Sequence, residues 1–189
     1  MEIVTVGTYI LVDGHFVFAF GPHSERPGRL AVVRVGGHRE DGETPWACAV
    51  REAMEETGLS IRPLPVGETL RWGRAAGTLE PTETQLGDPR PLLILPREDG
   101  PGAPVNVMYL VQADGVPAPL NVQGLLLLTP KEVLGLCHQP ATLRTFLAGG
   151  GQALMRDPFP IDWALEPALQ LQLLARLLAT GHHDLTAKE

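Results

Sequence analysis

Residues 37–59 read GHREDGETPWACAVREAMEETGL, and this stretch decides the fold expected for the rest of the chain. Its glycines and charged residues stand at fixed separations: Gly37, Glu43, Arg51, Glu52, Glu55, Glu56 and Gly58. Thr44 is a good N-cap and Pro45 suits the first helical position. Gly58 is placed to end a helix in the left-handed conformation. The stretch therefore predicts a glycine-led loop followed by a helix over residues 44–57.

Three carboxylates share one face of this predicted helix. With Glu52 at zero on the helical wheel, Glu55 lies at roughly −60° and Glu56 at roughly +40°. Like charges on adjacent turns repel one another, so a cation is expected to compensate them. Hard oxygen ligands suit Mg²⁺ or Mn²⁺, which polarise phosphoryl oxygens and activate water. The opposite face is predicted to pack on a sheet through Trp46, Val50, Ala53 and Thr57.

The remaining fixed residues have roles around this face. Gly36 and Gly37 permit unusual backbone angles and close approach, so that a main-chain carbonyl can face a metal ion. Arg51 stays protonated and is expected to pair with Glu43, which would hold the loop against the helix.

The pattern resembles the Nudix box, and every fixed position of that motif is filled. The resemblance implies that Glu52, Glu55 and Glu56 bind divalent cations together with a glycine carbonyl, from Gly36 or Gly37. It also implies catalysis by water attack on a nucleoside diphosphate linked to another moiety, with Glu52, Glu55 and Arg51 as the catalytic set and Glu43 and Gly58 as structural residues. The fold implied is an α/β (α+β) sandwich of α/β/α type with a mixed sheet.

Hydrophobic and turn patterns around the box agree with such a sheet. Asp13-Gly14 is a strong hairpin signal between two strand-like segments. Strands are predicted at 3–12, 15–20, 30–35, 66–72, 91–96, 105–112 and 122–129, and residues 73–90 are predicted to be a polar insertion. Short helices are expected from Thr129-Pro130 and over 141–147, and a longer one from about Pro167 to Gly181. We expect one domain over 1–189, with a core of about 1–137 and a C-terminal helical extension of about 138–189.

Composition excludes several classes of function. The net charge is −7 and no basic patch is visible, which argues against nucleic acid as the partner. No apolar run is long enough for a membrane span, and no signal peptide is recognisable. The two cysteines give no disulfide framework, which favours the cytoplasm. The expected partner is a small nucleotide substrate.

Several residues are candidates for the substrate contacts and for the general base. Arg34 and Arg71 are candidates for phosphate, and Trp72 and Tyr109 for stacking on a base. The candidates for the general base on the helix are Glu52 and Glu55. A loop acid could serve instead: Glu80, Glu83, Asp88 or Glu98. His138 is a weaker candidate. Motifs that mark individual substrate classes of the family are absent.

Two alternatives to a small-molecule hydrolase fit the sequence less well. A nucleotide sensor without catalysis would be expected to lose a box glutamate, and an RNA cap hydrolase would be expected to carry a basic patch. The leucine-rich arc of residues 169–178 also suggests a homodimer, because such a helix is buried against its own domain or a second subunit.

Overall fold

The computed structural model describes residues 2–84, 86–100 and 102–181, so positions 182–189 of the expected extension lie outside it. Its helices are α1 (Pro45–Thr57), α2 (Pro130–His138), α3 (Leu143–Ala148) and α4 (Leu169–Thr180). Its strands are β1 (Ile3–Val12), β2 (His15–Pro22), β3 (Arg29–Val33), β4 (Ile61–Pro63), β5 (Thr69–Gly73), β6 (Thr78–Thr82), β7 (Leu93–Pro96), β8 (Val105–Ala113), β9 (Gly124–Leu128), β10 (Ala141–Thr142), β11 (Gln152–Met155) and β12 (Ala164–Pro167). None of the helices within these ranges is long and apolar enough to cross a membrane.

The strands form one mixed sheet, as expected. Its main path runs β10-β12-β3-β2-β1-β8-β7-β5-β6, while β9 pairs with β2, β11 with β9, and β4 with β8. The pairs β1–β8, β3–β12 and β5–β7 are parallel, and the other pairs are antiparallel. The hairpin predicted at Asp13-Gly14 joins β1 to β2, and Asp13 has a positive φ of 46° there. The central pair β1–β8 brings the N-terminal strand beside a segment a hundred residues later.

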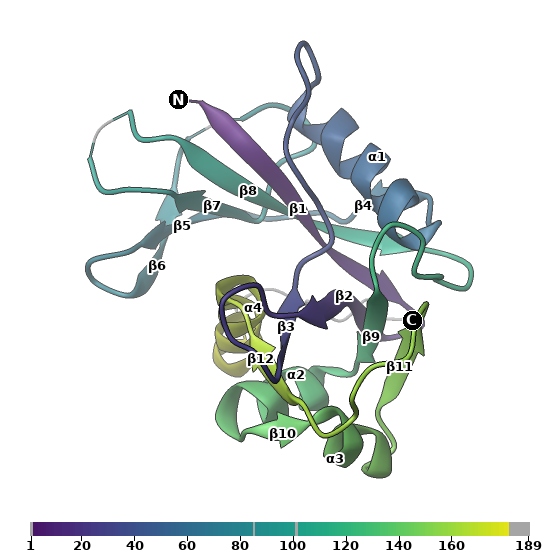
Figure 1. Ribbon diagram of the computed structural model, residues 1–189. Helices are drawn as coiled ribbons and strands as arrows, with labels where there is room; N and C mark the ends of the chain where they lie inside the picture. The colour runs from purple at the N-terminus through teal and green to yellow at the C-terminus, as the bar shows by residue number, and fades with distance from the viewer. Residues whose placement is uncertain (1, 85, 101, 182–189) are drawn as a thin grey trace.

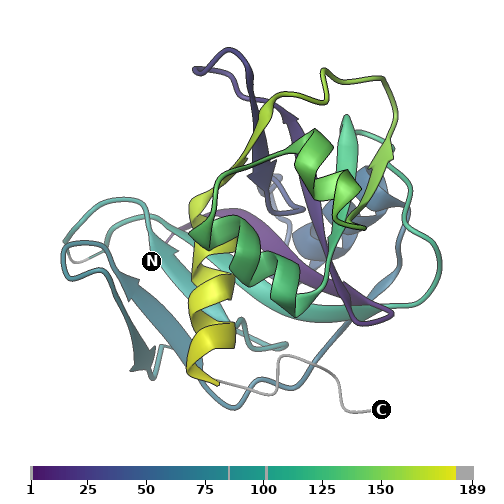
Figure 2. The ribbon, with the colours of Figure 1, turned by 90° about the horizontal axis from the view of Figure 1, so that it is seen from below.

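The sheet separates two hydrophobic layers because side chains alternate along each strand. On β8, Val107, Tyr109 and Val111 belong to the layer that α1 covers. Met108 and Leu110 point to the other layer, which α2 and α4 cover. Figure 2 shows α2 and α4 in front of the sheet and α1 behind it, which is the expected α/β/α arrangement.

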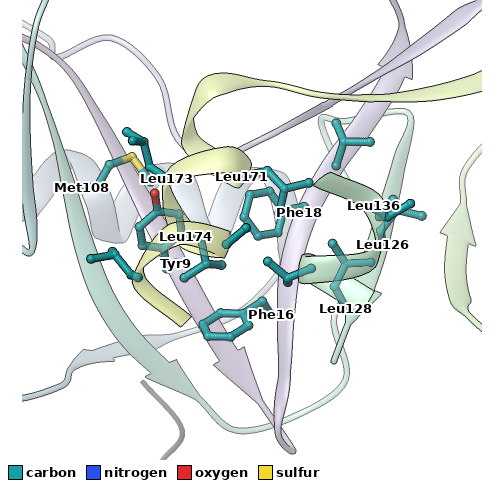
Figure 3. Packing of buried hydrophobic residues seen from close by; sticks show 14 of the residues in the cluster. Tyr9, Phe16, Phe18, Met108, Leu126, Leu128, Leu136, Leu171, Leu173 and Leu174 are labelled. Carbon is teal, nitrogen blue, oxygen red and sulfur yellow. The ribbon is translucent and has the colours of Figure 1, made fainter. Parts of the chain in front are cut away.

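The apolar arc of α4 is buried within its own chain. Leu171, Leu173 and Leu174 are fully buried and meet aromatic residues of β1 and β2, as Figure 3 shows. Tyr9 donates its hydroxyl hydrogen bond to the Gln170 carbonyl at 2.7 Å, which ties the helix to the central strand. Only Leu169 of the arc is markedly exposed, at 37%. The arc therefore no longer supports a dimer, because the domain itself covers it.

Several strands differ from the prediction. The segment 73–90, predicted as a polar insertion, contains β6, which pairs with β5 in a hairpin. The extension is not wholly helical, because β10, β11 and β12 join the sheet. The helix expected at 141–147 begins only at Leu143, since Thr142 is its N-cap and belongs to β10. All four strands are short, and the partners of β11 and β12, which are β9 and β3, come from earlier parts of the chain (Figure 1).

Candidate active site

Helix α1 begins and ends where its sequence predicts. The Thr44 side chain accepts a hydrogen bond from the Ala47 N–H at 3.1 Å. Gly58 has φ 71° and its N–H donates to the Met54 carbonyl, so the helix stops in the left-handed conformation. The buried face consists of Cys48, Ala49, Ala53 and Thr57. Val50, predicted to pack on the sheet, is instead 38% exposed, because the buried face is centred on Ala49 and Ala53 and Val50 lies about 100° around the helix from Ala49.

The C-terminal end of α1 is capped by the segment after β8. The backbone N–H groups of Ala118, Leu120 and Asn121 donate to the carbonyls of Thr57, Glu56 and Glu55, respectively. Helix ends leave such carbonyls without intrahelical partners. The backbone that carries two of the box glutamates is therefore fixed from outside the helix.

Arg51 joins the loop to the acidic face of α1. Its Nε and Nη2 donate to the two carboxylate oxygens of Glu43 at 2.9 and 3.0 Å, which is the predicted pair. Its Nη1 donates to Glu52 Oε1 at 2.7 Å and to Glu55 Oε2 at 3.3 Å. Its Nη2 also reaches the His38 carbonyl at 3.1 Å. The guanidinium lowers the pKa of Glu43 to about 2, so that this carboxylate stays charged.

Two glycines allow the loop to touch the acidic face and the central strand. A Cβ on Gly37 would overlap the Glu52 carboxylate, and a Cβ on Gly36 would overlap the Val6 carbonyl. Gly36 has φ 136°, a conformation that L side chains rarely adopt. Its N–H donates to Glu56 Oε2 at 2.8 Å. The Gly37 carbonyl, a predicted metal ligand, accepts from the Val6 N–H at 2.9 Å.

Arg34 occupies the space beside these glycines. Its Nη1 donates to the Gly36 carbonyl at 2.6 Å, while its Nε is buried without a hydrogen-bond partner among the residues described. The side chain crosses β1 over Gly7, where a Cβ would overlap Arg34 Cδ. Burial lowers the pKa of Arg34, and Glu56 and Glu52 oppose that shift. Sequence reasoning named Arg34 but missed Gly7, although a glycine inside a β-branched strand often marks a close approach.

The chemistry of the donors fits a divalent cation. Burial raises the pKa of Glu56 to about 7 despite the Gly36 N–H, and the neighbouring charges of Glu52 and Glu55 add to the rise. A bound cation would relieve this repulsion. In the side-chain positions of the described residues, no three carboxylate, imidazole or thiol groups already converge on one point. Arg51 instead binds Glu52 and Glu55, and the Gly36 N–H binds Glu56.

The four candidates for substrate contact are placed differently. Arg34 lies at the acidic face, as described above. Arg71 alternates with Leu70 and Trp72 on β5, so it points to the face of the sheet that α1 covers. Tyr109 is on that face but is 2% exposed and packs edge-on against Trp46. Trp72 belongs to the layer on the α4 side, where the Arg176 guanidinium lies 5.2 Å from its ring. The structure therefore does not bring Trp72 to the box.

The alternative general bases come from elements other than α1. Glu80 is on the edge strand β6, and the exposed Glu83, Asp88 and Glu98 lie on loops beside β6 and β7. The loop between β6 and β7 carries Leu86, which packs on the layer that α1 covers. His138 ends α2 on the other face of the sheet and lines a pocket of about 390 Å³ with Arg29 and Glu166. Among the candidates, Glu52 and Glu55 are the ones that stand beside Gly37 and Arg51.

Comparison with known proteins agrees with the box. The family model described as the NUDIX domain matches residues 2–105. A hydrolase of the NUDIX family from Clostridium perfringens superposes with a TM-score of 0.50 at 13% identity, over 97% of this chain and 99% of that one. A NUDIX hydrolase from Nitrosomonas europaea gives 0.49 at 12% identity, over 100% of this chain and 77% of that one. A MutT NUDIX hydrolase from Burkholderia pseudomallei gives 0.42 at 19% identity, over 78% and 95%.

Because the sequence identity is low, the superposition on the Clostridium perfringens hydrolase supports the fold alone. The family assignment rests on the match to the family model. That match covers more than half of the chain and includes the whole of residues 37–59. The chain therefore belongs to the NUDIX domain family and is a Nudix hydrolase, a pyrophosphohydrolase.

Proposed function

We propose that this protein is a metal-dependent hydrolase that cleaves the diphosphate linkage of a nucleoside diphosphate derivative by water attack on phosphorus. The observation that carries the proposal is the arrangement of the acidic face around the glycines. Glu56 bonds the Gly36 N–H, and Gly37 approaches the Glu52 carboxylate so closely that no side chain fits there. Substrate phosphates and a cation would thus meet carboxylates whose backbone is held in place.

Glu52 and Glu56 are proposed to hold the cation, with Glu55 as a further ligand or as the general base. Glu55 suits the second role because it is the most exposed of the three and its bond to Arg51 is the longest, at 3.3 Å. A Mg²⁺ ion, or Mn²⁺, would supply charge neutralisation at the diphosphate and a more acidic bound water. The Gly36 carbonyl is a poorer candidate, because Arg34 already holds it.

Arg51 is proposed to set the position of Glu52 by way of the loop. It binds Glu43 through two hydrogen bonds and Glu52 through a third, so the loop and the catalytic face move together. Arg71 is proposed as the contact for the substrate's distal phosphate, because β5 turns it to the same face of the sheet as α1. No nucleic acid is proposed as a substrate, since the chain is acidic overall.

The test is a hydrolysis screen of the wild type and Glu56→Gln with Mg²⁺, with Mn²⁺ and with chelator. The substrates are nucleoside triphosphates, nucleotide sugars, ADP-ribose, dinucleoside polyphosphates and coenzyme A. We expect metal-dependent cleavage of one class, lowered by at least about 100-fold in Glu56→Gln. Glu80→Gln, an exposed carboxylate on β6, is the matched control and should keep wild-type activity.

Turnover by Glu56→Gln at the wild-type rate would show that the assignment of the metal site to α1 is wrong. Silence of a folded wild type across the panel, with nucleotide binding retained, would favour a sensor without catalysis. Thermal unfolding of both variants checks that a loss of activity is not a loss of fold.

A further inference from the structure

Arg34 is a positive charge built into the place where a cation is expected. Its Nη1 donates to the Gly36 carbonyl at 2.6 Å, and this oxygen is one of the two glycine oxygens expected to face a metal ion. The backbone N–H of the same residue donates to Glu56 Oε2 at 2.8 Å. The two peptide groups that flank Gly36 Cα thus link a guanidinium to a box carboxylate, with the arginine on the carbonyl oxygen and the glutamate on the N–H.

The chain makes room for Arg34 at a specific point. A Cβ on Gly7 would overlap Arg34 Cδ and would stand 2.6 Å from Met108 Sδ. Gly7 therefore lets an arginine cross the central strand where a side chain would otherwise stand. The Gly36 backbone lies equally close to β1, because its own Cβ would stand 2.6 Å from Gly7 Cα. These two glycines fix the distance between Arg34 and the acidic face.

Attraction to the acidic face offsets part of the free-energy cost of burying the Arg34 guanidinium. Arg34 Nε is buried without a hydrogen-bond partner among the residues described, which opposes the placement. Glu56 and Glu52 are the groups that most favour the charged guanidinium. A metal ion on those carboxylates and Arg34 would therefore compete for the same negative charge.

We propose that Arg34 is an internal counter-ion of the acidic face, which occupies the Gly36 carbonyl and weakens metal binding by Glu52 and Glu56. The inference rests on the proposed metal site and assigns to Arg34 a positioning role in it. It predicts a metal site that forms without the Gly36 carbonyl. It also predicts that loss of the positive charge tightens metal binding, whereas a residue that only contacts substrate would leave it unchanged.

The experiment is a titration with Mn²⁺ alone, in which electron paramagnetic resonance measures the free ion. The full chain is used, without substrate. We expect Arg34→Met to bind Mn²⁺ about tenfold more tightly or better. Arg34→Lys keeps the charge and should stay within about threefold of the wild type. Arg29→Met is the matched control, because Arg29 lies at the start of β3, the strand that leads into Arg34, and pairs with Glu166, and it should bind as the wild type does.

Arg34→Gln is included because it removes the charge but can still donate to the Gly36 carbonyl. Tighter binding in this variant supports the role of charge even where Arg34→Met does not fold. Unchanged or weaker Mn²⁺ binding by folded Arg34→Met and Arg34→Gln would overturn the inference and leave the metal site standing. Absence of Mn²⁺ binding by every variant up to millimolar concentration would overturn both this inference and the proposed metal-dependent reaction.

Discussion

Gly7 on β1 and Arg34 just after β3 form a complementary pair, in which the missing side chain of one creates the space that the other fills. A Cβ on Gly7 would overlap Arg34 Cδ and crowd Met108 Sδ, which comes from the neighbouring strand β8. The two residues are far apart in sequence and are brought together by the order of the strands. The relationship links the middle of the sheet to the loop that carries Gly36.

Gly7→Ala should therefore destabilise the fold through Arg34. We expect the free energy of unfolding to fall by about 1–3 kcal/mol, because overpacking forces neighbouring side chains out of place. Chemical denaturation would measure it. Gly67→Ala is the matched control, since a Cβ there meets nothing within 4 Å, and it should change stability by no more than about 0.5 kcal/mol.

The double variant Gly7→Ala with Arg34→Ala makes this prediction specific. Removal of the arginine side chain should recover much of the loss, so the two changes should not be additive. If the two losses simply add, the strain comes from elsewhere around Gly7.

Arg51→Ala should lower stability as well as activity. Glu43 is 12% exposed and depends on Arg51 for two hydrogen bonds, so the variant leaves a largely buried carboxylate with less compensation. We expect a loss of about 2–4 kcal/mol in the free energy of unfolding. Arg51→Lys should recover only part of it, because an ammonium group cannot reproduce the paired geometry.

Arg144→Ala is the control for this prediction. Arg144 also binds a carboxylate, Asp162, through two hydrogen bonds, but both side chains are more than half exposed. Exposed pairs contribute little, so urea denaturation should not resolve this variant from the wild type. Equal losses in Arg51→Ala and Arg144→Ala would show that the box arginine is an ordinary surface partner.

Glu56 should make the stability of the metal-free protein depend on pH. Burial raises its pKa to about 7 in the folded chain, against an ordinary glutamate value of 4.5. Between these values the folded state binds more protons than the unfolded state. The free energy of unfolding should therefore fall as pH rises through this window, with no further contribution above about pH 7.

The comparison that isolates this effect is wild type against Glu56→Gln, both in chelator. The stability difference between them should move by about 2 kcal/mol in favour of the variant from about pH 5 to about pH 7.5. Parallel profiles of the two proteins across that range would mean that Glu56 titrates normally.

Local signals made the box helix predictable. Thr44, Pro45 and Gly58 each act on their own backbone, so the limits of α1 follow from neighbouring residues alone. The pair Arg51–Glu43 was predictable for a similar reason, because only the N-cap and the first turns of α1 separate the two residues. The strands β11 and β12 were missed because each is short and pairs with a strand far away in sequence, whereas β6 was missed because its polar sequence hides a local hairpin with β5.

The local sequence pattern also could not predict which side of the sheet buries each aromatic residue. Trp72 and Tyr109 were both named as stacking candidates, yet they lie in opposite layers of the sheet. Which layer an aromatic residue enters depends on strand register, and register is a property of pairs of strands. The position of Arg34 over Gly7 likewise depends on which strands are neighbours.

The parallel pairing of β1 with β8 has a consequence for any attempt to shorten the chain. The family match ends at residue 105, the first residue of β8, so a fragment cut there loses the partner of β1 from Thr5 to Leu11. Such a fragment would also lack Met108 beneath Arg34 and the backbone donors at 118–121 that hold the end of α1. The segment that identifies the family is thus smaller than the segment that must be translated before the box glutamates take up their positions.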